Sequence, residues 1–378
     1  MPSRPASARR PHEFKRGREI GGNIRRIYLG ETSVQKAASR DGSLDCQRRC
    51  VLVVGGSGYV GSVLVRQLLQ KGYKVRVLDR FLYRNSLALE GICDEPALSI
   101  VRGDLCRAED RERALDGATD VVLLAALVGD PISRKYPELT RDVNETGARA
   151  LAEACNRRGI RNFVFTSTCS NYGLRETAEP ATEDSELKPL SIYAETKVAF
   201  ERFLLDQRAS FDFIPTILRI STAYGTSPRM RFDLTVNEFV YALASGQTLE
   251  VFDKDTWRPY CHVRDISEAI SLVLEAKAEI VSGEVFNVGS DENNFTKAMI
   301  VGEIRKHIQC DERVRFVEGG SDPRNYRVSF RKISEKLGFR AQHPVAEYVP
   351  ELIRCIQSGM YLRLDEIRDY YGNYKVAS

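Results

Sequence analysis

The sequence lacks any long apolar segment. No uninterrupted apolar run in its 378 residues reaches the roughly 20 residues that a transmembrane helix needs. The longest candidates, such as 121–128, have the length of a strand. The continuous apolar stretch of a secretory signal peptide is also missing. We therefore expect no membrane partner and a cytoplasmic location.

A basic surface is missing from most of the chain. The formal net charge is +4, but residues 1–50 hold 12 Lys and Arg against 5 Asp and Glu, so residues 51–378 sum to −3. That part has no basic excess of the kind used in nucleic-acid binding, so we expect no nucleic-acid partner. Residues 1–48, rich in Arg, Ser and Gly, are predicted to be a disordered basic extension. Their acidic residues and missing apolar face argue against a transit peptide.

The nine cysteines show no repeating frame. Cys46 and Cys50 have no second pair nearby, which argues against a zinc site. We interpret the cysteines as buried thiols in a reducing compartment and predict no metal ligands.

From about residue 49 the chain alternates apolar strands with amphipathic helices. Such alternation favours parallel pairing with right-handed crossovers. Near-continuous apolar strands such as VVLLAA fit a sheet covered on both faces. We therefore predict an α/β fold with a Rossmann-type doubly wound parallel sheet. The expected strands are 50–56, 73–80, 98–102, 119–126, 162–167 and 214–220, and the expected helices are 59–71, 108–115, 136–158 and 192–209.

This regular alternation ends after Gly225. A helix is expected near 234–244, and strands near 249–252 and 284–288. We predict a smaller mixed α/β substrate-binding domain. The predicted boundaries are 49–225 and about 257–290 for the Rossmann domain, and about 226–256 and 291–378 for the substrate-binding domain.

A glycine-rich turn, GGSGYVG, joins the first strand to the first helix. Gly55, Gly58 and Gly61 allow a tight turn and let backbone amides approach a pyrophosphate. The helix that follows offers unpaired N–H groups and the positive end of its dipole. Asp79 ends the second strand, where a carboxylate accepts hydrogen bonds from an adenosine ribose. Because a 2′-phosphate would meet that charge, NAD is favoured over NADP, although Arg80 weakens the preference.

A second carboxylate, Asp104, follows the third strand in the sequence GDL. It could reach the adenine amino group of a dinucleotide, or it could be a helix cap or turn carboxylate. Both interpretations stay open.

Tyr193 and Lys197 form a Tyr-x-x-x-Lys pattern on a predicted helix, which puts both side chains on one face. A phenol has an ordinary pKa near 10 and needs a nearby positive charge to act as a base. Thr168 ends a predicted strand, at the sheet edge where ligands of α/β proteins bind. We predict that these three residues remove a hydroxyl proton while a hydride leaves to NAD.

Together these residues resemble the extended short-chain dehydrogenase/reductases of the NAD-dependent nucleotide-sugar epimerase/dehydratase family. GGSGYVGS, GDL, LLAALVGD, TSTCSNYG, YAETK, LRISTAYG and WRPYCHVRD occur in that family's order across 49–346. The resemblance implies tightly held NAD, catalysis by Thr168, Tyr193 and Lys197, and a homodimer or higher oligomer joined through the helices at 136–158 and 192–209. It also implies cofactor contacts from Tyr59, Val60, Leu105, Leu124, Ala125 and Ala126, besides Tyr193 and Lys197.

Two departures from the family narrow the implied reaction. Members that dehydrate carry Asp-Glu directly after the catalytic Thr, where this chain has Cys169-Ser170, so 4,6-dehydration is disfavoured. Members that epimerise beside a ketone often have Cys at the position of Ser170, whereas the cysteine of this chain, Cys169, is one position away, so that reaction is not supported either. What remains is oxidation at one carbon, expected to be C4, by a 4-epimerase or a 4-dehydrogenase.

Three stretches resemble a branch of the family active on sugars of surface polysaccharides. They are SPRMRFDLTVN, VGDP and SDPRNYRV, and the branch includes GDP-heptose 4-dehydrogenases. This resemblance does not specify the nucleotide or the sugar.

The expected partner is a nucleotide-diphosphate sugar, which requires cationic contacts that Arg can make in bidentate form. Arg258 and Arg324 resemble diphosphate-binding positions, and Arg231 lies on the loop that opens the second domain. His262 is expected to be structural. The further predicted substrate contacts are Val128, Asn144 and Asn237.

Two other functions compete with this hypothesis. One is a regulatory or redox-sensing protein that binds NAD without turnover, and the other is a reductase acting on a keto sugar. An intact set of Thr168, Tyr193 and Lys197 argues against the first.

Overall fold

The computed structural model describes residues 46 and 48–376, apart from 176, 178, 321, 323 and 362–367. The basic extension predicted at 1–48 therefore lies outside the described residues, except for Cys46 and Arg48. No helix in the described part of the chain has the length and apolar character needed to cross a membrane. Within the same residues, no group of three or more His, Cys, Asp or Glu side chains could hold a metal ion.

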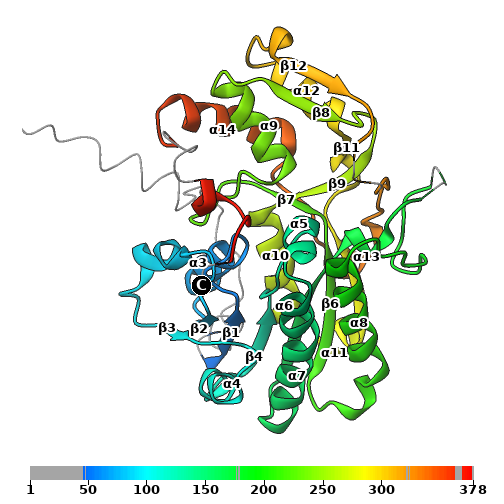
Figure 1. The fold of residues 1–378 in the computed structure, drawn as a ribbon. Helices are drawn as coiled ribbons and strands as arrows, with labels where there is room; N and C mark the ends of the chain where they lie inside the picture. The colour runs from blue at the N-terminus through cyan, green and yellow to red at the C-terminus, as the bar shows by residue number, and fades with distance from the viewer. Residues whose placement is uncertain are drawn as a thin grey trace, which may run out of the picture. The chain divides into compact units, whose positions relative to one another are not determined.

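A parallel sheet of seven strands forms the centre of the larger region (Figure 1). Its strands are β1 (Cys50–Val54), β2 (Lys74–Asp79), β3 (Leu98–Arg102), β4 (Asp120–Leu123), β5 (Asn162–Thr168), β6 (Ile214–Ile220) and β10 (Glu284–Val288). They lie in the order β10-β6-β5-β4-β1-β2-β3, with every neighbouring pair parallel. The chain changes direction of winding between β1 and β4, which is where open α/β sheets bind ligands. The predicted doubly wound sheet is confirmed.

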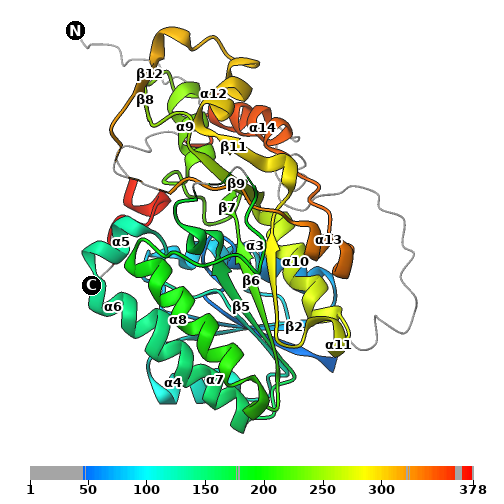
Figure 2. The ribbon, with the colours of Figure 1, turned by 90° about the vertical axis from the view of Figure 1, so that its right-hand side faces the viewer.

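Helices cover both faces of this sheet (Figure 2). They are α3 (Gly61–Gln70) and α10 (Val263–Glu275) on one face, and α4 (Ala108–Leu115), α7 (Ala148–Arg157) and α8 (Ile192–Asp206) on the other. Val51 and Val53 of β1 pack in the core with α3 and α10, while Leu52 and Val54 pack with α4, α7 and α8. Successive strand side chains point to opposite faces, so a sheet covered on both faces needs unbroken apolar strands.

The helix predicted at 136–158 is interrupted. It consists of α6 (Pro137–Arg141), a π-helical turn (Asp142–Gly147) and then α7. The turn contains Asn144, whose side-chain amide donates to the carbonyl oxygen of Leu127 (3.2 Å) and accepts from its N–H (2.8 Å). These bonds tie the turn to the loop after β4. The interruption therefore accompanies a tertiary contact, which a local helix pattern does not reveal.

A smaller region with two short sheets lies beyond the carboxyl ends of the seven strands (Figure 1). Its strands are β7 (Thr222–Tyr224), β9 (Trp257–His262) and β11 (Asn294–Thr296) in one sheet, and β8 (Leu249–Phe252) and β12 (Val314–Val317) in the other. The helices α9 (Thr235–Ala244), α12 (Lys297–Arg305) and α14 (Val345–Gln357) share its apolar core. The predicted smaller mixed α/β region is confirmed, while the exact domain boundaries stay a prediction.

Short elements complete the described chain. The remaining α-helices are α5 (Asp130–Lys135), α11 (Ala278–Val281) and α13 (Arg331–Leu337). The short 3₁₀ helices are η1 (Asn85–Ile92), η3 (Cys169–Tyr172), η4 (Arg208–Ser210), η5 (Asp291–Asn293), η6 (Asp311–Arg313) and η7 (Arg368–Tyr371).

Candidate active site

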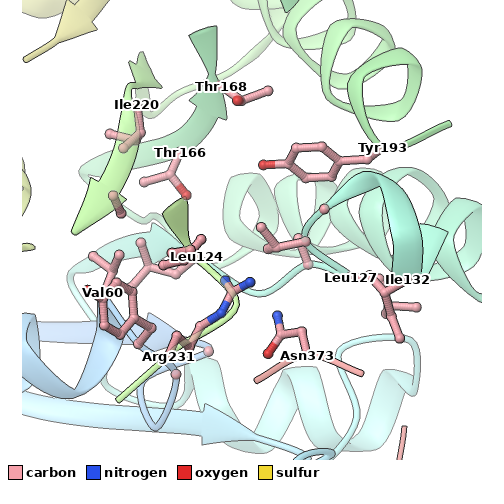
Figure 3. A pocket seen from close by; sticks show the side chains of 18 of the residues that line it. Val60, Leu124, Leu127, Ile132, Thr166, Thr168, Tyr193, Ile220, Arg231 and Asn373 are labelled. Atoms are coloured by element: carbon pink, nitrogen blue, oxygen red, sulfur yellow. The ribbon is translucent and has the colours of Figure 1, made fainter. Parts of the chain in front are cut away.

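A cavity of about 600 Å³ lies at the carboxyl ends of the central strands, between the sheet and the smaller region. It is lined by residues from many separate segments, and Figure 3 shows part of its wall. The structure brings nineteen of the predicted site residues together on this wall: Gly55, Gly58, Tyr59, Val60, Gly61, Asp79, Arg80, Asp104, Leu105, Leu124, Ala125, Ala126, Val128, Thr168, Tyr193, Lys197, Arg231, Arg258 and Arg324.

The glycine-rich turn between β1 and α3 leaves no room for side chains. Gly55 has a φ of +90°, and a Cβ there would lie 2.7 Å from the backbone nitrogen of Ala125. A Cβ on Gly61 would overlap the carbonyl oxygen of Gly55, and one on Gly58 would lie 3.2 Å from it. No side chain caps the start of α3, and the positive end of its dipole lies at this turn. The turn therefore fits the pyrophosphate of a dinucleotide.

Asp79 lies on the cavity wall at the end of β2. Its carboxylate accepts hydrogen bonds from the N–H groups of Ser57 (3.0 Å) and Phe81 (2.8 Å), and burial raises its pKa. The neighbouring Arg80 forms an ion pair with Asp104 (3.0 Å). Arg80 is thus already engaged by a carboxylate beside the site.

Asp104 combines features of both interpretations left open by the sequence. Its carboxylate accepts a hydrogen bond from the N–H of Cys106 (2.8 Å), as a turn carboxylate does. It also lines the cavity. A contact with adenine therefore stays a prediction.

Thr168, Tyr193 and Lys197 also line the cavity, and they come from β5 and α8. Thr168 ends β5, while Tyr193 and Lys197 lie on α8, which Ser191 caps by accepting from the N–H of Ala194 (3.3 Å). Figure 3 shows the Tyr193 hydroxyl pointing across the cavity toward the strand ends that carry Thr166 and Thr168.

Both residues of the Tyr-x-x-x-Lys pattern are buried. The Thr168 hydroxyl lies close enough to the Tyr193 phenol to act to lower its pKa. The Lys197 ammonium donates to the carbonyl oxygen of Thr166 (2.8 Å) and lies 6.0 Å from the Tyr193 ring centroid. The predicted grouping of the three side chains thus occurs in the structure.

Burial dominates the ionisation of both residues. It raises the pKa of Tyr193 to about 12, although the Thr168 hydrogen bond and the charges of Arg231 and Arg324 act to lower it. Burial lowers the pKa of Lys197 to about 7, against the effect of Glu201. The expected depression of the phenol pKa is therefore absent, because desolvation outweighs the nearby positive charges.

The predicted substrate arginines are paired with carboxylates. Arg231 makes a two-point contact with Asp233 (2.9 and 2.7 Å). Asp322 is shared by Arg258 (3.0 Å) and Arg324 (2.8 Å). Although burial opposes it, these two arginines hold the pKa of Asp322 well below its usual range. An anionic ligand would therefore compete with Asp322 for both guanidinium groups.

Two predicted substrate contacts, Asn144 and Asn237, do not line the cavity. Asn144 is 2% exposed and its amide bonds to the backbone of Leu127. Asn237 is 0% exposed; its amide donates to the Tyr59 hydroxyl (2.9 Å) and to the backbone oxygen of Arg231 (2.8 Å). Their amides hold neighbouring loops of the cavity wall in place, and a substrate contact from either residue stays a prediction.

Several lining residues had no sequence signal that marked them. Asp130 lies in the VGDP stretch, which predicts no role for it; its carboxylate accepts from the Ser191 hydroxyl (2.7 Å) and pairs with Arg324 (3.4 Å). Asn373 and Tyr374 come from the C-terminal end of the chain, where no motif indicates a site. Other lining residues without a predicted role include Tyr83, Asp233, Tyr260 and Asp322.

The sheet, the glycine turn and the Thr–Tyr–Lys group together define a class of dinucleotide-dependent oxidoreductases. A family model described as the NAD dependent epimerase/dehydratase family matches residues 51–289, which is more than half of the chain. The chain belongs to this family of enzymes, and the family resemblance seen in the sequence is confirmed.

Curated relatives and solved structures agree with this assignment. The chain is 30% identical over 312 residues to a UDP-glucose 4-epimerase of Corynebacterium glutamicum, and the match covers 78% of this chain and 91% of that relative. It is also 30% identical over 298 residues to a dTDP-glucose 4,6-dehydratase of Streptomyces griseus, covering 76% and 88%. A crystal structure of the UDP-glucose 4-epimerase of Thermus thermophilus in complex with NAD is similar, with a TM-score of 0.68, 26% identity and coverage of 81% and 99%.

Proposed function

We propose that this chain is an NAD-dependent enzyme that oxidises one carbon, C4, of a nucleotide-diphosphate sugar. It acts as a 4-epimerase or a 4-dehydrogenase. The observation that carries this proposal is the placement of the Thr168–Tyr193–Lys197 group and the glycine-rich turn on one cavity wall.

The residues at the glycine turn would hold the cofactor. Gly55, Gly58 and Gly61 would leave space for the pyrophosphate, and Asp79, which lines the cavity beside them, would bind the adenosine ribose. Arg80, the cation that could have favoured a 2′-phosphate, is paired with Asp104, which supports NAD over NADP. When bound, NAD supplies the hydride acceptor for the oxidation.

Tyr193 is the proposed proton acceptor for the sugar hydroxyl. Its hydroxyl points into the cavity toward the strand end that carries Thr168, which would hydrogen-bond the reacting oxygen. Lys197 is held by the carbonyl oxygen of Thr166, with its nitrogen 6.0 Å from the centroid of the Tyr193 ring. A phenol accepts a proton only as its phenolate, so the sugar proton moves to Tyr193 once the phenol proton has left; burial opposes that loss, and the charges of Arg231 and Arg324 favour it.

The arginine side of the cavity supports a nucleotide-diphosphate substrate. Arg258 and Arg324 converge on the single carboxylate of Asp322, so a diphosphate has two guanidinium groups to bind when it displaces that carboxylate. Arg231 lies on the same wall. The solved relative structures include one protein bound to UDP-glucose and NAD, which supports this substrate class.

The residues after Thr168 favour simple oxidation over dehydration. Cys169 is buried, and burial raises the pKa of its thiol to about 12, so it offers no acid or base to the cavity. Ser170 reaches the cavity but carries no carboxylate.

The resemblance to the surface-polysaccharide branch supports a role in making such sugars. A homodimer or higher oligomer is also part of the proposal, to be checked by light scattering.

The test is a panel of UDP-, GDP-, CDP- and dTDP-sugars incubated with the purified protein and NAD. Products are identified by mass and NMR. We expect one nucleotide sugar to give a 4-epimer or a 4-keto product. Bound NAD with no product from any sugar would instead indicate a regulatory binder, and product formed only from a keto sugar with NADH would indicate a reductase.

A further inference from the structure

The described C-terminal segment, 368–376, crosses from the smaller region to the region of the seven-stranded sheet. We refer to it as the C-terminal strap. At its start the backbone oxygen of Tyr371 accepts from the N–H of Phe232 (2.8 Å), and the Tyr371 ring packs edge-on against the rings of Phe232 (5.9 Å) and Tyr361 (6.0 Å). This first anchor belongs to the core of the smaller region.

The other end of the strap is anchored in a different core. Val376 packs against the apolar cluster that contains Leu52, Leu78 and Leu105 beneath the cavity. Asn373 lies between the two anchors, and its side chain is on the cavity wall (Figure 3). Figures 1 and 2 show the red C-terminal end running from the smaller region toward the region of the sheet.

Arg229 fastens the middle of the strap. Its guanidinium donates to the backbone oxygen of Gly372 (3.1 Å) and to the side-chain oxygen of Asn373 (3.1 Å). The N–H of Asn373 donates in turn to the carboxylate of Asp233 (3.1 Å). The strap is thus held by three polar contacts between its two apolar anchors.

Arg229 also has unused hydrogen-bonding capacity inside the cavity. The residue is 3% exposed and lines the cavity, and among the described residues its Nη1 has no hydrogen-bond partner. A buried donor without a partner is costly, and an anionic oxygen from a ligand would satisfy it. The structure therefore indicates a ligand contact at this nitrogen.

The position of Arg229 indicates which part of a ligand it would meet. Its guanidinium lies 5.2 Å from the centroid of the Tyr83 ring, which follows β2 and lines the cavity. Asp79 lines the same cavity, and although burial raises the pKa of its carboxyl, the positive charge of Arg229 acts to lower it. Asp79 is the residue proposed to bind the adenosine ribose.

We infer that the C-terminal strap and Arg229 form one wall of the dinucleotide site and slow the release of the bound cofactor. Arg229 Nη1 would donate to an oxygen of the dinucleotide, and Asn373 and Tyr374 would cover its adenosine half. This inference rests on the proposed binding of NAD and adds a retention element to it.

Gly372 offers a substitution that disturbs only this wall. A Cβ at Gly372 would overlap the ring of Tyr374, while the Gly372 backbone oxygen that Arg229 uses would be unchanged. Gly372→Ala should therefore push the ring away from the cavity wall. Gly302→Ala is the matched control, since a Cβ there meets nothing within 4 Å and Gly302 lies in α12, away from the cavity. Arg229→Met removes the proposed donor separately.

The experiment loads the full-length proteins with radiolabelled NAD and measures its release into an excess of unlabelled NAD. We expect release to be about tenfold faster from Gly372→Ala and from Arg229→Met than from the wild type, which corresponds to about 1.4 kcal/mol. Gly302→Ala should match the wild type. Thermal unfolding, measured alongside, identifies a variant that has failed to fold.

Two failures can be told apart. If the wild type retains labelled NAD and both folded variants release it at the wild-type rate, the strap has no role in retention and the inference is overturned. If the wild type binds no labelled NAD, the proposed function itself fails, and the inference fails with it.

Discussion

Replacing Tyr193 by Phe removes the proposed proton acceptor and leaves the packing of the ring in place. Tyr193 is 8% exposed, and its hydroxyl is the part that reaches toward Thr168 across the cavity. General acid–base groups contribute about 10²–10⁴-fold to enzyme rates. We therefore expect turnover to fall at least about a hundredfold, which is about 2.7 kcal/mol of transition-state stabilisation.

Burial makes the phenolate form of Tyr193 costly in free energy. With the pKa near 12, forming a free phenolate at pH 7 costs about 7 kcal/mol, at about 1.4 kcal/mol for each pH unit. Tyr193 can therefore accept the sugar proton only after the phenol proton has left, and the charges of Arg231 and Arg324 favour that loss.

The assay follows the NADH absorbance band with the sugar identified in the panel, and bound NAD is quantified separately. NAD should stay bound to Tyr193→Phe. Tyr73→Phe is the matched control, since Tyr73 is a buried tyrosine that does not line the cavity, and it should keep its turnover. Wild-type turnover in Tyr193→Phe would refute the proposed role of the phenol.

Three further changes test other parts of the site. Gly58→Ala places a Cβ 3.2 Å from the Gly55 oxygen, in the space proposed for the pyrophosphate. The affinity for NAD, measured by calorimetry, should fall at least about tenfold, and an unchanged affinity would contradict pyrophosphate binding at the glycine-rich turn. Burial lowers the pKa of Lys197 from 10.5 to about 7 in the folded protein. Between these two pH values the unfolded chain binds more protons than the folded protein, so the free energy of unfolding of the wild type should rise with pH. Lys197→Met should lose that rise in urea unfolding of the NAD-free protein across this pH range, and equal slopes would argue against a buried lysine. Arg258→Lys replaces a guanidinium that can bind a phosphate at two points by a single ammonium, and should raise the KM for the nucleotide sugar about tenfold with little change in kcat; an unchanged KM would remove Arg258 from substrate binding.

The strands of the sheet could be predicted because their signal is local. The runs at 98–102, 214–220 and 284–288 agree with β3, β6 and β10 residue for residue. Each is a short apolar-rich segment with turn residues beside it. The break within 136–158 could not be predicted in this way, because it goes with the buried bonds between Asn144 and Leu127.

The chemistry-bearing part of the site was also visible in local spacing. The glycine turn lies between a strand and a helix, and Tyr193 and Lys197 share a helix face four residues apart, so short patterns identify them. Nothing local distinguishes an Asn that holds a loop from an Asn that binds a ligand, so the bond from the Asn237 amide to the backbone of Arg231 could not be predicted. The C-terminal strap reaches the cavity through packing of Val376, a contact between distant parts of the chain.

The pairing of the arginines was likewise hidden in the sequence. Arg258 and Asp322 are far apart along the chain and meet only when the smaller region folds. Sequence spacing could suggest that Arg258 and Arg324 bind an anion, but not that both guanidinium groups pair with the carboxylate of Asp322.

The most direct test of the whole account uses the nucleotide sugar found in the panel, labelled with deuterium at C4. The purified protein is supplied with NAD, and the cofactor and the sugar are analysed by mass spectrometry after partial turnover. The account predicts that deuterium is transferred from C4 to the reduced cofactor, or returned from it to C4 with inverted configuration. Deuterium that never leaves C4 while product accumulates would contradict oxidation at that carbon.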